Sequence, residues 1–205
     1  RFITISREYG CAGFRIADRL ASALNEKITG DEPLWTVYDR KLVEVVCADH
    51  KLNRVLVDNL DRQRKFVFGD YFTGMFTGEP SLIKIFKKFA ETIFDLAAHG
   101  RVIIIGRASC IITGKLTGGL HVRIVAPLEW RVKQVAAHEK IDDLKKARKY
   151  VLKNDLERGK FAQDFVAEDT REPAHYDLVL NQEKLGVERT VSILLETMKI
   201  KSQEV

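Results

Sequence analysis

The stretch FITISREYGCAGFRIADRLASAL, residues 2–24, joins a β-branched run, a turn of small residues and a helical pattern. Its second half repeats apolar residues at helical spacing, so one face of the helix is apolar. These residues are Ile16, Ala17, Leu20 and Leu24. A strand, a tight turn and a helix in this order commonly hold a phosphate, because N–H groups and the helix dipole converge on one anion. The stretch therefore predicts an α/β fold, with either an anion site or a purely structural turn at residues 10–13.

The rest of the chain alternates strand and helix patterns in the same way. Four further runs rich in Val, Ile or Leu are typical of buried strands: residues 35–39, 101–106, 121–126 and 176–181. Near-continuous apolar runs are expected in a parallel sheet that helices cover on both faces. The helical patterns span residues 81–100, 127–140 and 186–199. The alternation predicts an α/β three-layer sandwich around a parallel five-stranded sheet with right-handed crossovers.

Length and composition fit one such unit. The chain has 205 residues, of which 45% are hydrophobic, enough to bury the core of a single domain over residues 1–205. Residues 48–80 and 139–172 do not fit the alternation, and insertions in α/β folds usually lie at the ligand end of the sheet and often move. The net charge of +5 and the sequence pI of about 9.1 favour an anionic partner such as a nucleotide, a polyphosphate or a nucleic acid.

The cysteines and the apolar runs indicate the cellular compartment in which we expect the protein. Cys11, Cys47 and Cys110 are odd in number and far apart, so they predict neither a disulfide framework nor a zinc ribbon, and a reducing cytoplasm fits best. No run is long enough to span a bilayer, and the first residues do not resemble a signal peptide. Because Arg1 directly precedes a strand, we expect an initiating methionine and a few further residues before it. The five histidines show no ligand spacing, so we expect no protein-bound metal centre.

The turn after the first strand lacks the lysine of an ordinary phosphate-binding loop. Its small residues are Gly10, Cys11, Ala12 and Gly13. Gly13 occupies the lysine position, and Phe14 follows it without a hydroxyl for magnesium. Of the nearest cations, Arg7 ends the strand, where ligands of open α/β sheets gather, whereas Arg15 is more simply explained as solvent-facing. The Cys11 thiol at a helix start is either reactive or a serine-sized filler, and we favour the filler.

Several short motifs follow one another along the chain. The first is formed by Ile5, Ser6, Arg7, Gly10, Cys11, Ala12 and Gly13. The others are YDRKL (38–42), IIIGRA (103–108), APLEWR (126–131), DLERGKFAQDFVA (155–167) and HYDLVLNQEKLG (175–186). This ordered series resembles the cytidylate kinase-like family of P-loop proteins, which opens with a pattern close to I-S-R-x-x-G-S-G-G and also lacks the loop lysine. The resemblance touches nearly every predicted core element and mainly misses residues 43–100.

The resemblance implies an ATP-dependent kinase that phosphorylates a nucleoside monophosphate, CMP or a related one, in the presence of Mg²⁺. It assigns the donor nucleotide to the turn and the first helical residues: Gly10, Cys11, Ala12, Gly13, Phe14 and Arg15. Arg7 and Arg158 would stabilise the charge of the transferred group. Magnesium would be held mainly by the nucleotide and water, with Ser6 as a substitute protein ligand.

On the acceptor side, the resemblance points to Asp39, Arg40 and Arg107. Asp39 alternatively caps the helix that starts just after it. Arg107 follows a buried strand and needs an anion nearby, either the acceptor phosphate or a carboxylate such as Asp39. Residues 48–100 would form an acceptor-side insertion and helix. Residues 139–172 would form a lid, for which a solvated charged helix face is the alternative.

The sequence departs from the family at two points in the lid region. Ala162 stands where the family has an aromatic residue, and residues 167–170 replace a T-G-x-x-W pattern. Together with Gly13 and Phe14, these departures favour a rival: a nucleotide-binding regulatory protein on the same fold that catalyses weakly or not at all. A nucleic-acid binder is less favoured, because the cations are spread along the chain and no recognition module is present. We therefore expect nucleotide partners, no nucleic acid and no membrane.

Overall fold

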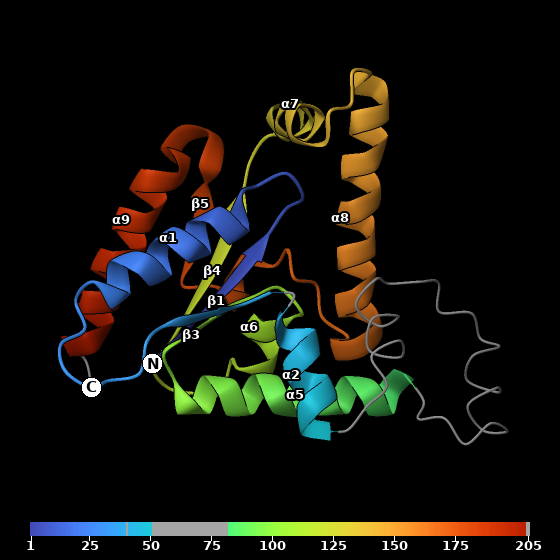
Figure 1. Ribbon diagram of the computed structural model, residues 1–205. Coiled ribbons are helices and arrows are strands. Elements are labelled where there is room, and N and C mark those ends of the chain that lie inside the picture. The colour runs from blue at the N-terminus through green and yellow to red at the C-terminus, as the bar shows by residue number, and fades with distance from the viewer. Residues whose placement is uncertain (40, 51–81, 204–205) are drawn as a thin grey trace, which may run out of the picture.

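The computed structural model describes residues 1–39, 41–50 and 82–203. Its centre is a five-stranded sheet in which every neighbouring pair of strands is parallel. The strands are β1 (Phe2–Arg7), β2 (Thr36–Tyr38), β3 (Val102–Ile105), β4 (Gly119–Val125) and β5 (Leu178–Asn181). Their order is β2-β3-β1-β4-β5, which puts β1 in the middle (Figure 1). The predicted parallel sheet is confirmed.

Helices follow the strands as the sequence predicts. They are α1 (Gly13–Asn25), α2 (Lys41–His50), α5 (Leu82–His99), α6 (Ser109–Ile112), α7 (Leu128–Glu139), α8 (Leu144–Val166) and α9 (Gln182–Gln203). A short 3-10 helix, η1 (Pro173–His175), precedes β5. Within α9, Gly186 is non-helical with φ +67°, so a single turn precedes the main helix. None of the described helices is long and apolar enough to cross a membrane.

The sheet is the middle of three layers (Figure 1). On one face, Ile3 and Ile5 of β1 are buried with Ile16 and Leu20 of α1, and α9 packs beside them. On the other face, Phe2 is buried with apolar residues of α2 and α5. Because successive side chains of a strand point to opposite faces and both faces are covered, β1 carries apolar residues on both faces, at Phe2, Ile3 and Ile5.

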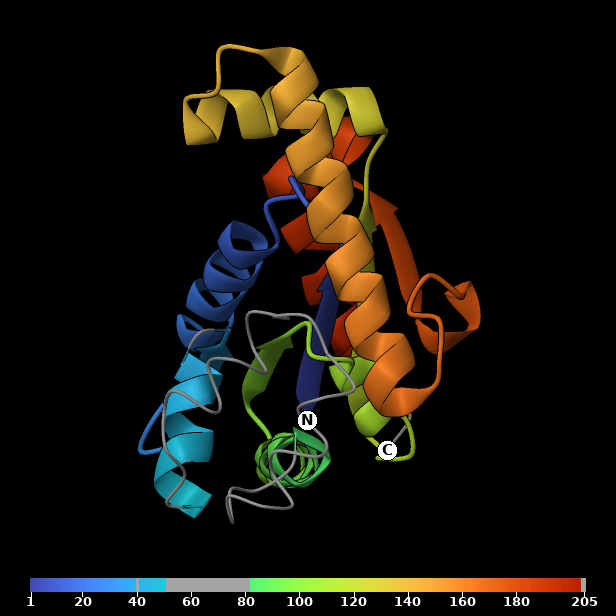
Figure 2. The same cartoon turned by 90° about the vertical axis from the view of Figure 1, so that its right-hand side faces the viewer.

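The charged segment over residues 139–172 consists mostly of α8, a helix of 23 residues. Asp143 caps its start, because Oδ1 accepts the N–H of Lys145 at 2.8 Å and the N–H of Lys146 at 3.4 Å. α8 packs against α7 and then runs down past β1 towards α6 and the segment before β5 (Figure 2). The middle of this helix thereby reaches the carboxyl end of β1.

The predicted acceptor-side insertion is described only in part. Its last portion is α5, whose buried face includes Ile85, Phe89 and Ile93 at the spacing that the sequence predicts. The helix ends before Gly100, which has φ +83° and so adopts a conformation that favours glycine. Residues 51–81, including the aromatic and glycine-rich run, lie outside the described residues.

Candidate functional site

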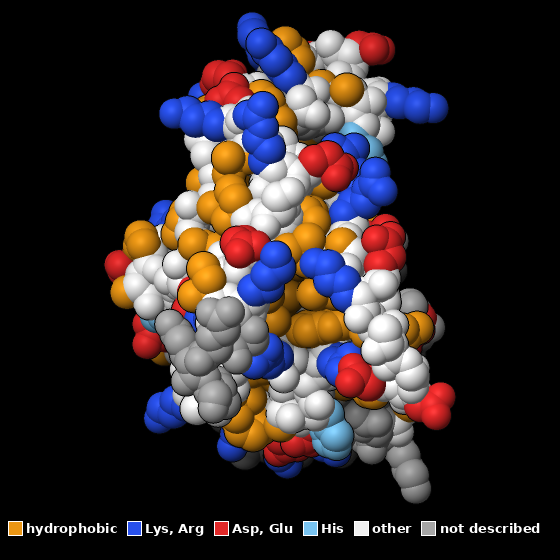
Figure 3. Space-filling model, turned by 90° about the vertical axis from the view of Figure 1, so that its left-hand side faces the viewer, with side chains coloured by type: hydrophobic (Ala, Val, Ile, Leu, Met, Phe, Trp, Pro, Cys, Tyr) orange, Lys and Arg blue, Asp and Glu red, His pale blue; other side chains and the backbone are white. Residues whose placement is uncertain are grey.

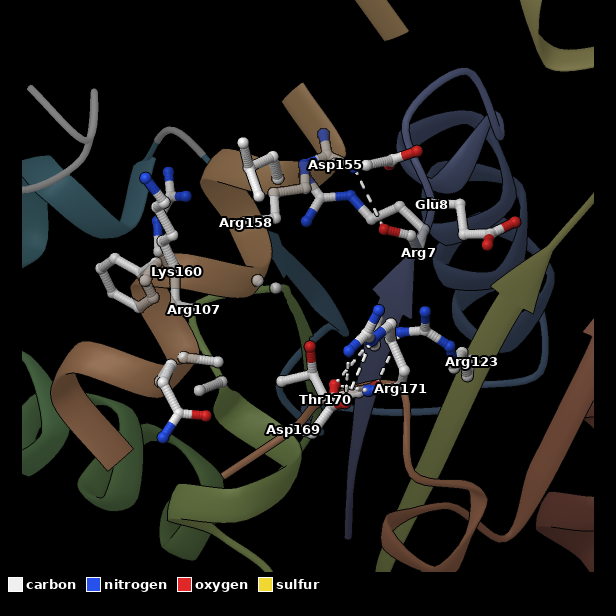
Figure 4. Close-up of a pocket in the computed structure, with 18 residues that line it drawn as sticks. Arg7, Glu8, Arg107, Arg123, Asp155, Arg158, Lys160, Asp169, Thr170 and Arg171 are labelled. Carbon is white, nitrogen blue, oxygen red and sulfur yellow. Dashed lines mark hydrogen bonds and ion pairs between the residues drawn. The ribbon is translucent and has the colours of Figure 1, made fainter. Parts of the chain in front are cut away.

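A cavity of about 570 Å³ lies between the sheet and α8. It is bounded by the carboxyl end of β1, the turn after β3, β4, the middle of α8 and residues 169–171 (Figure 4). Its basic side chains are Arg7, Arg107, Arg123, Arg158, Lys160 and Arg171, and its acidic ones are Glu8, Asp155 and Asp169. Guanidinium groups in excess around one cavity are suited to binding an oxyanion such as a phosphate.

Arg7 lies between two glycines at the end of β1. A Cβ atom on Gly106 would collide with the Arg7 guanidinium, and one on Gly13 would lie 3.1 Å from Arg7 Cγ. Gly106 also has φ +73°, which few residues other than glycine adopt. The guanidinium pairs with the Asp39 carboxylate at 3.6 Å. The structure therefore places Arg7 at the cavity and fixes its side chain from three sides.

Arg158 reaches the same place from α8. Its Nη1 donates to the carbonyl oxygen of Arg7 at 3.1 Å, and its guanidinium lies over the Tyr9 ring at 5.0 Å from the centroid. Burial lowers the pKa of Arg158 from its usual value, since it disfavours the charged form. Two arginines that are 151 residues apart in sequence thus meet at the carboxyl end of β1.

Arg107 completes this group from the turn after β3. It lines the cavity on the same side as Lys160 (Figure 4). Its backbone is left-handed, with φ +59°, a strained conformation that is frequent at ligand sites. Of the other acceptor-side candidates, Asp39 pairs with Arg7, and α2 begins two residues after it. Arg40 lies outside the described residues.

The N–H groups of the predicted phosphate turn are largely engaged within the protein. The N–H of Tyr9 donates to Asp155 Oδ1 at 2.7 Å, and that of Ala12 donates to Gln182 Oε1 at 2.8 Å. The N–H groups of Cys11 and Gly13 donate to backbone carbonyls at 3.2 and 2.7 Å. The expectation of a cradle of unpaired groups at residues 10–13 is therefore not met as stated, since the N–H groups of Cys11, Ala12 and Gly13 already have acceptors within the protein.

Some backbone N–H groups next to this turn have no hydrogen-bond acceptor in the part of the chain that the structure describes. Within the described residues, nothing accepts a hydrogen bond from the N–H groups of Gly10, Phe14 or Arg15. The last two belong to the first turn of α1, where orphan N–H groups and the helix dipole attract anions. The side chains of Phe14 and Arg15 are exposed, as the sequence predicts for Arg15. Any contribution of these two residues to an anion site would thus come from the backbone.

A buried ionic network that the sequence alone does not reveal supports this turn. Arg131 of α7 is 6% exposed, and its Nη1 donates to Asp155 Oδ2 at 2.6 Å and to the Tyr9 carbonyl at 2.9 Å. Its Nε donates to the Ala126 carbonyl at 3.0 Å and lies 3.3 Å from Glu8 Oε2. α7, α8 and the turn are therefore tied together by one guanidinium.

The cavity residue Arg123 is likewise not identified by the sequence analysis. It lies in β4 and lines the cavity, although the strand around it is apolar. A signal was present: a charged residue in a strand predicted to be covered on both faces requires a polar environment or a ligand. The apolar residues of the run 121–126 nevertheless favour a buried strand, so the sequence alone does not single out Arg123.

Cys11 is buried and 8% exposed. Burial raises the pKa of its thiol to about 12, and the nearby Glu8 carboxylate contributes to the same shift. The neutral thiol is therefore the stable form at ordinary pH. This geometry agrees with the interpretation of Cys11 as a filler of the turn.

We expect Cys11 to resist thiol reagents in the folded protein. With a pKa near 12, the thiolate fraction at pH 7 is on the order of 10⁻⁵, and the thiolate is the reactive form. Labelling with N-ethylmaleimide followed by peptide mass spectrometry measures this directly. Cys110, also buried and with a raised pKa, is the matched control. Both should be modified only after denaturation, and selective labelling of Cys11 in the folded protein would contradict the assignment.

The described residues do not form a ligand set for a protein-held Mg²⁺. The cavity's carboxylates already face cationic groups: Glu8 and Asp155 contact Arg131, and Asp169 contacts Arg171. Ser6 Oγ accepts a hydrogen bond from Arg123 Nη1 at 3.1 Å, so a divalent cation at Ser6 would meet a guanidinium. The substitute role expected for Ser6 is thus disfavoured, and magnesium fits better as a companion of a bound nucleotide.

The face formed by α1 and α9 carries basic and acidic side chains interspersed, with apolar side chains between them (Figure 3). Arg19 of α1, for example, lies 3.5 Å from Glu188 of α9. A mixed surface of this kind lacks the continuous basic stripe that nucleic-acid binding needs. The positive net charge is expressed most clearly inside the cavity.

Comparison with known proteins gives one family match. The model of the cytidylate kinase-like family matches residues 2–184. A cytidylate kinase of Staphylothermus marinus is 27% identical over 103 residues, which are 50% of this chain and 57% of that protein. The chain therefore spans little more than half the length of this curated relative.

Two solved structures resemble the fold over its whole length. A protein of Eubacterium ventriosum described as uncharacterized superposes with a TM-score of 0.70 at 18% identity, covering 97% of both chains. A shikimate kinase of Bacteroides thetaiotaomicron superposes with a TM-score of 0.54 at 9% identity, covering 97% of this chain and 98% of the other. At these identities, the two structures show the fold.

Proposed function

This chain belongs to the cytidylate kinase-like family, and we propose that it transfers a phosphoryl group from ATP to a nucleoside monophosphate, with CMP as the first acceptor to test. The observation that carries the proposal is the convergence of Arg7, Arg107 and Arg158 on one cavity beside the start of α1. Phosphoryl transfer requires little covalent chemistry from the protein, but it does require fixed positive charge around the transferred group. Three guanidinium groups from three separate elements supply that charge.

On the donor side, the proposal uses the backbone. The N–H groups of Gly10, Phe14 and Arg15 and the dipole of α1 would bind the ATP phosphates. The N–H groups of residues 11–13 would join them once Gln182 and the neighbouring carbonyls are displaced. Magnesium would arrive with the nucleotide, since the described residues favour no protein-held ion.

On the acceptor side, Arg107 would bind the monophosphate. Asp39 would act through Arg7 and, together with Arg40, would orient the acceptor. Residues 48–100 would cover the acceptor, and residues 139–172 would act as a lid, from which Arg158 already reaches the cavity. We take the chain as one domain over residues 1–205. The 1–39 and 82–203 parts of the structure support this, because α8 and β1 share contacts at the cavity.

A coupled assay of ADP release with ATP, Mg²⁺ and a panel of CMP, dCMP, UMP, AMP and GMP tests the proposal. We expect turnover with at least one pyrimidine monophosphate and none without acceptor. The Arg158→Ala protein, purified in the same way, controls for contaminating kinases. Binding of ATP without turnover on any monophosphate would remove the kinase proposal.

One observation favours a second candidate, a nucleotide-binding protein that does not catalyse. Asp155 and Gln182 already occupy N–H groups of the turn, and Gly13 stands in place of the loop lysine. The assay of ADP formation separates the candidates: both predict heat with ATP and Mg²⁺ in isothermal calorimetry, but only the kinase predicts ADP formation with an acceptor.

Replacement of Arg107 by alanine should raise the KM for the acceptor. A hydrogen bond to a charged group contributes about 1.5–3 kcal/mol, so its loss corresponds to about a 10- to 100-fold rise. The KM for ATP should change little, because the donor is assigned to the turn and the start of α1, none of whose residues lines the cavity beside Arg107. Steady-state kinetics with each substrate varied in turn measure the split, with Arg189→Ala on the exposed surface of α9 as the control. An unchanged acceptor KM would contradict the assignment.

Replacement of Gly106 by alanine should impair catalysis by displacing Arg7. The new Cβ would overlap the guanidinium, and small misplacements of a charge at a reacting centre cost about tenfold or more in kcat. Gly30→Ala is a matched control, because Gly30 also has positive φ, +81°, but has open space around it. Both variants should lose about 1 kcal/mol of stability through backbone strain. Equal kcat values for the two variants would show that the position of Arg7 does not matter.

A further inference from the structure

The cavity contains a buried cation that the proposed transfer does not use. Arg123 of β4 lies opposite Ser6 of β1 in the register of the sheet and is 8% exposed. Like Ser6, it faces the cavity between the sheet and α8. Its guanidinium therefore forms part of the cavity floor, below the turn that follows β1.

The partners of Arg123 are all neutral. Nη1 donates to Ser6 Oγ at 3.1 Å and to the Thr170 carbonyl at 2.8 Å, and the guanidinium lies 5.9 Å from the centroid of the Tyr176 ring. Among the residues that the structure describes, no carboxylate forms an ion pair with it. A charge that is largely removed from water without a counter-ion is unfavourable unless an anion joins it.

The carboxylate on the adjacent wall is already committed. Asp169 accepts hydrogen bonds from Arg171 Nε at 3.0 Å and from Arg171 Nη2 at 2.8 Å. The hydrogen bonds from Arg171 hold the pKa of Asp169 at about 2, so it stays charged and paired. The charge of Asp169 also acts on Arg123 at longer range, but no carboxylate of the described residues hydrogen-bonds to Arg123, so a ligand anion would be its first direct counter-ion.

Figure 4 shows Arg123 and Arg171 on one side of the cavity and Arg107 and Lys160 on the other. A single phosphate bound at Arg107 would leave Arg123 and Arg171, on the opposite side of the cavity, without a ligand. We propose that Arg123 forms a second oxyanion subsite, which binds an acidic group of the acceptor other than the phosphate at Arg107. The naming of this ligand as the acceptor rests on the proposed function, whereas the subsite itself does not.

The chemical class that fits is a nucleotide with a second acidic group, a further phosphate or a carboxylate. CMP would leave Arg123 without an anion. The subsite therefore ranks a cytidine nucleotide that carries a second phosphate above CMP as an acceptor, and cytidine 3′,5′-bisphosphate is the probe used to test it.

The alternative role of Arg123 is structural, as an anchor for Thr170. The substitution Arg123→Gln separates the two roles, because a glutamine amide still donates to a carbonyl but carries no charge. Arg123→Lys keeps the charge and serves as a second variant. Circular dichroism establishes that both variants are folded before binding is compared.

The direct test follows the Arg123 Nε–Hε cross-peak in ¹⁵N-labelled protein, assigned by its absence from Arg123→Lys. Titration with inorganic phosphate at constant ionic strength should shift this cross-peak saturably, both in the parent and in Arg107→Gln. A parallel titration with acetate distinguishes a phosphate site from a carboxylate site. No shift with either anion, or a shift that disappears in Arg107→Gln, would overturn a separate subsite.

Kinetics test the assignment to the acceptor. The parent should prefer the 3′-phosphorylated cytidine nucleotide to CMP by about tenfold in KM, and Arg123→Gln should abolish that preference. Equal KM values in the parent would overturn the assignment to the acceptor. The absence of turnover on any acceptor, with the cross-peak still shifting, would remove the kinase proposal and leave the subsite intact.

Discussion

Replacement of Arg158 by alanine should lower kcat by about 1000-fold, in the range by which a single arginine at the transferred phosphoryl group accelerates transfer. Arg158 is half-buried and is held by the Arg7 carbonyl and the Tyr9 ring, so its charge is fixed before a ligand binds. Such preorganised charge stabilises the transition state more than the bound nucleotide. The Kd for ATP should therefore change by less than about threefold.

The measurement combines single-turnover rates with calorimetry of ATP binding. Lys153→Ala, on the exposed side of the same helix, is the matched control and should behave as the parent. Arg158→Lys should recover only part of the rate, since an ammonium does not reproduce the planar guanidinium. Equal rates for Arg158→Ala and the parent would show that α8 contributes no charge to the reaction.

Replacement of Arg131 by alanine should produce the largest loss of stability, about 3 kcal/mol. Removal of one partner from a buried ionic network costs about 3–5 kcal/mol, and the lower end applies because Glu8 and Asp155 retain partial contact with water. The Tyr9 and Ala126 carbonyls lose their donors as well. For a chain of this size, the loss lowers Tm by about 10 °C.

Urea unfolding followed by circular dichroism gives the free energy of unfolding for this comparison. Arg148→Ala is the control, because Arg148 pairs with Glu129 on the surface and such pairs contribute about 0–1 kcal/mol. A free energy of unfolding for Arg131→Ala within about 1 kcal/mol of the parent would contradict the role assigned to the network.

The sheet could be predicted because the residue pattern that produces each strand lies within one short run of sequence. β1 and β3 are covered on both faces, so β3 is apolar throughout and β1 carries apolar residues on both of its faces, and such runs alternate with amphipathic helices. The same reasoning placed Arg7 and Arg107 at the cavity, since both follow directly on a strand and the carboxyl ends of parallel strands meet at one edge. Arg158 required the family resemblance, because its helix has no strand to fix its position.

The contacts between remote segments could not be predicted. The ion pair of Asp39 with Arg7 and the bonds of Arg131 depend on how loops and helices dock, and no local pattern encodes that. The engaged N–H groups of the turn are a further case: Asp155 and Gln182, which accept from Tyr9 and Ala12, are 146 and 170 residues away in sequence. A glycine-rich turn indicates where an anion can bind, but not what already occupies its donors.

The occupation of these two donors couples the turn to distant helices. An anion that takes over the Tyr9 and Ala12 N–H groups would displace Asp155 Oδ1 of α8 and Gln182 Oε1 of α9 from the turn, while Asp155 Oδ2 keeps its bond to Arg131. Because such an anion would bind the state in which these two contacts are open, any change that favours the open state should raise the affinity of the turn for the anion. If the turn binds an anion as proposed, the carboxylate of Asp155 and the amide oxygen of Gln182 would compete with it for these two N–H groups and would thereby raise the ligand concentration that binding requires.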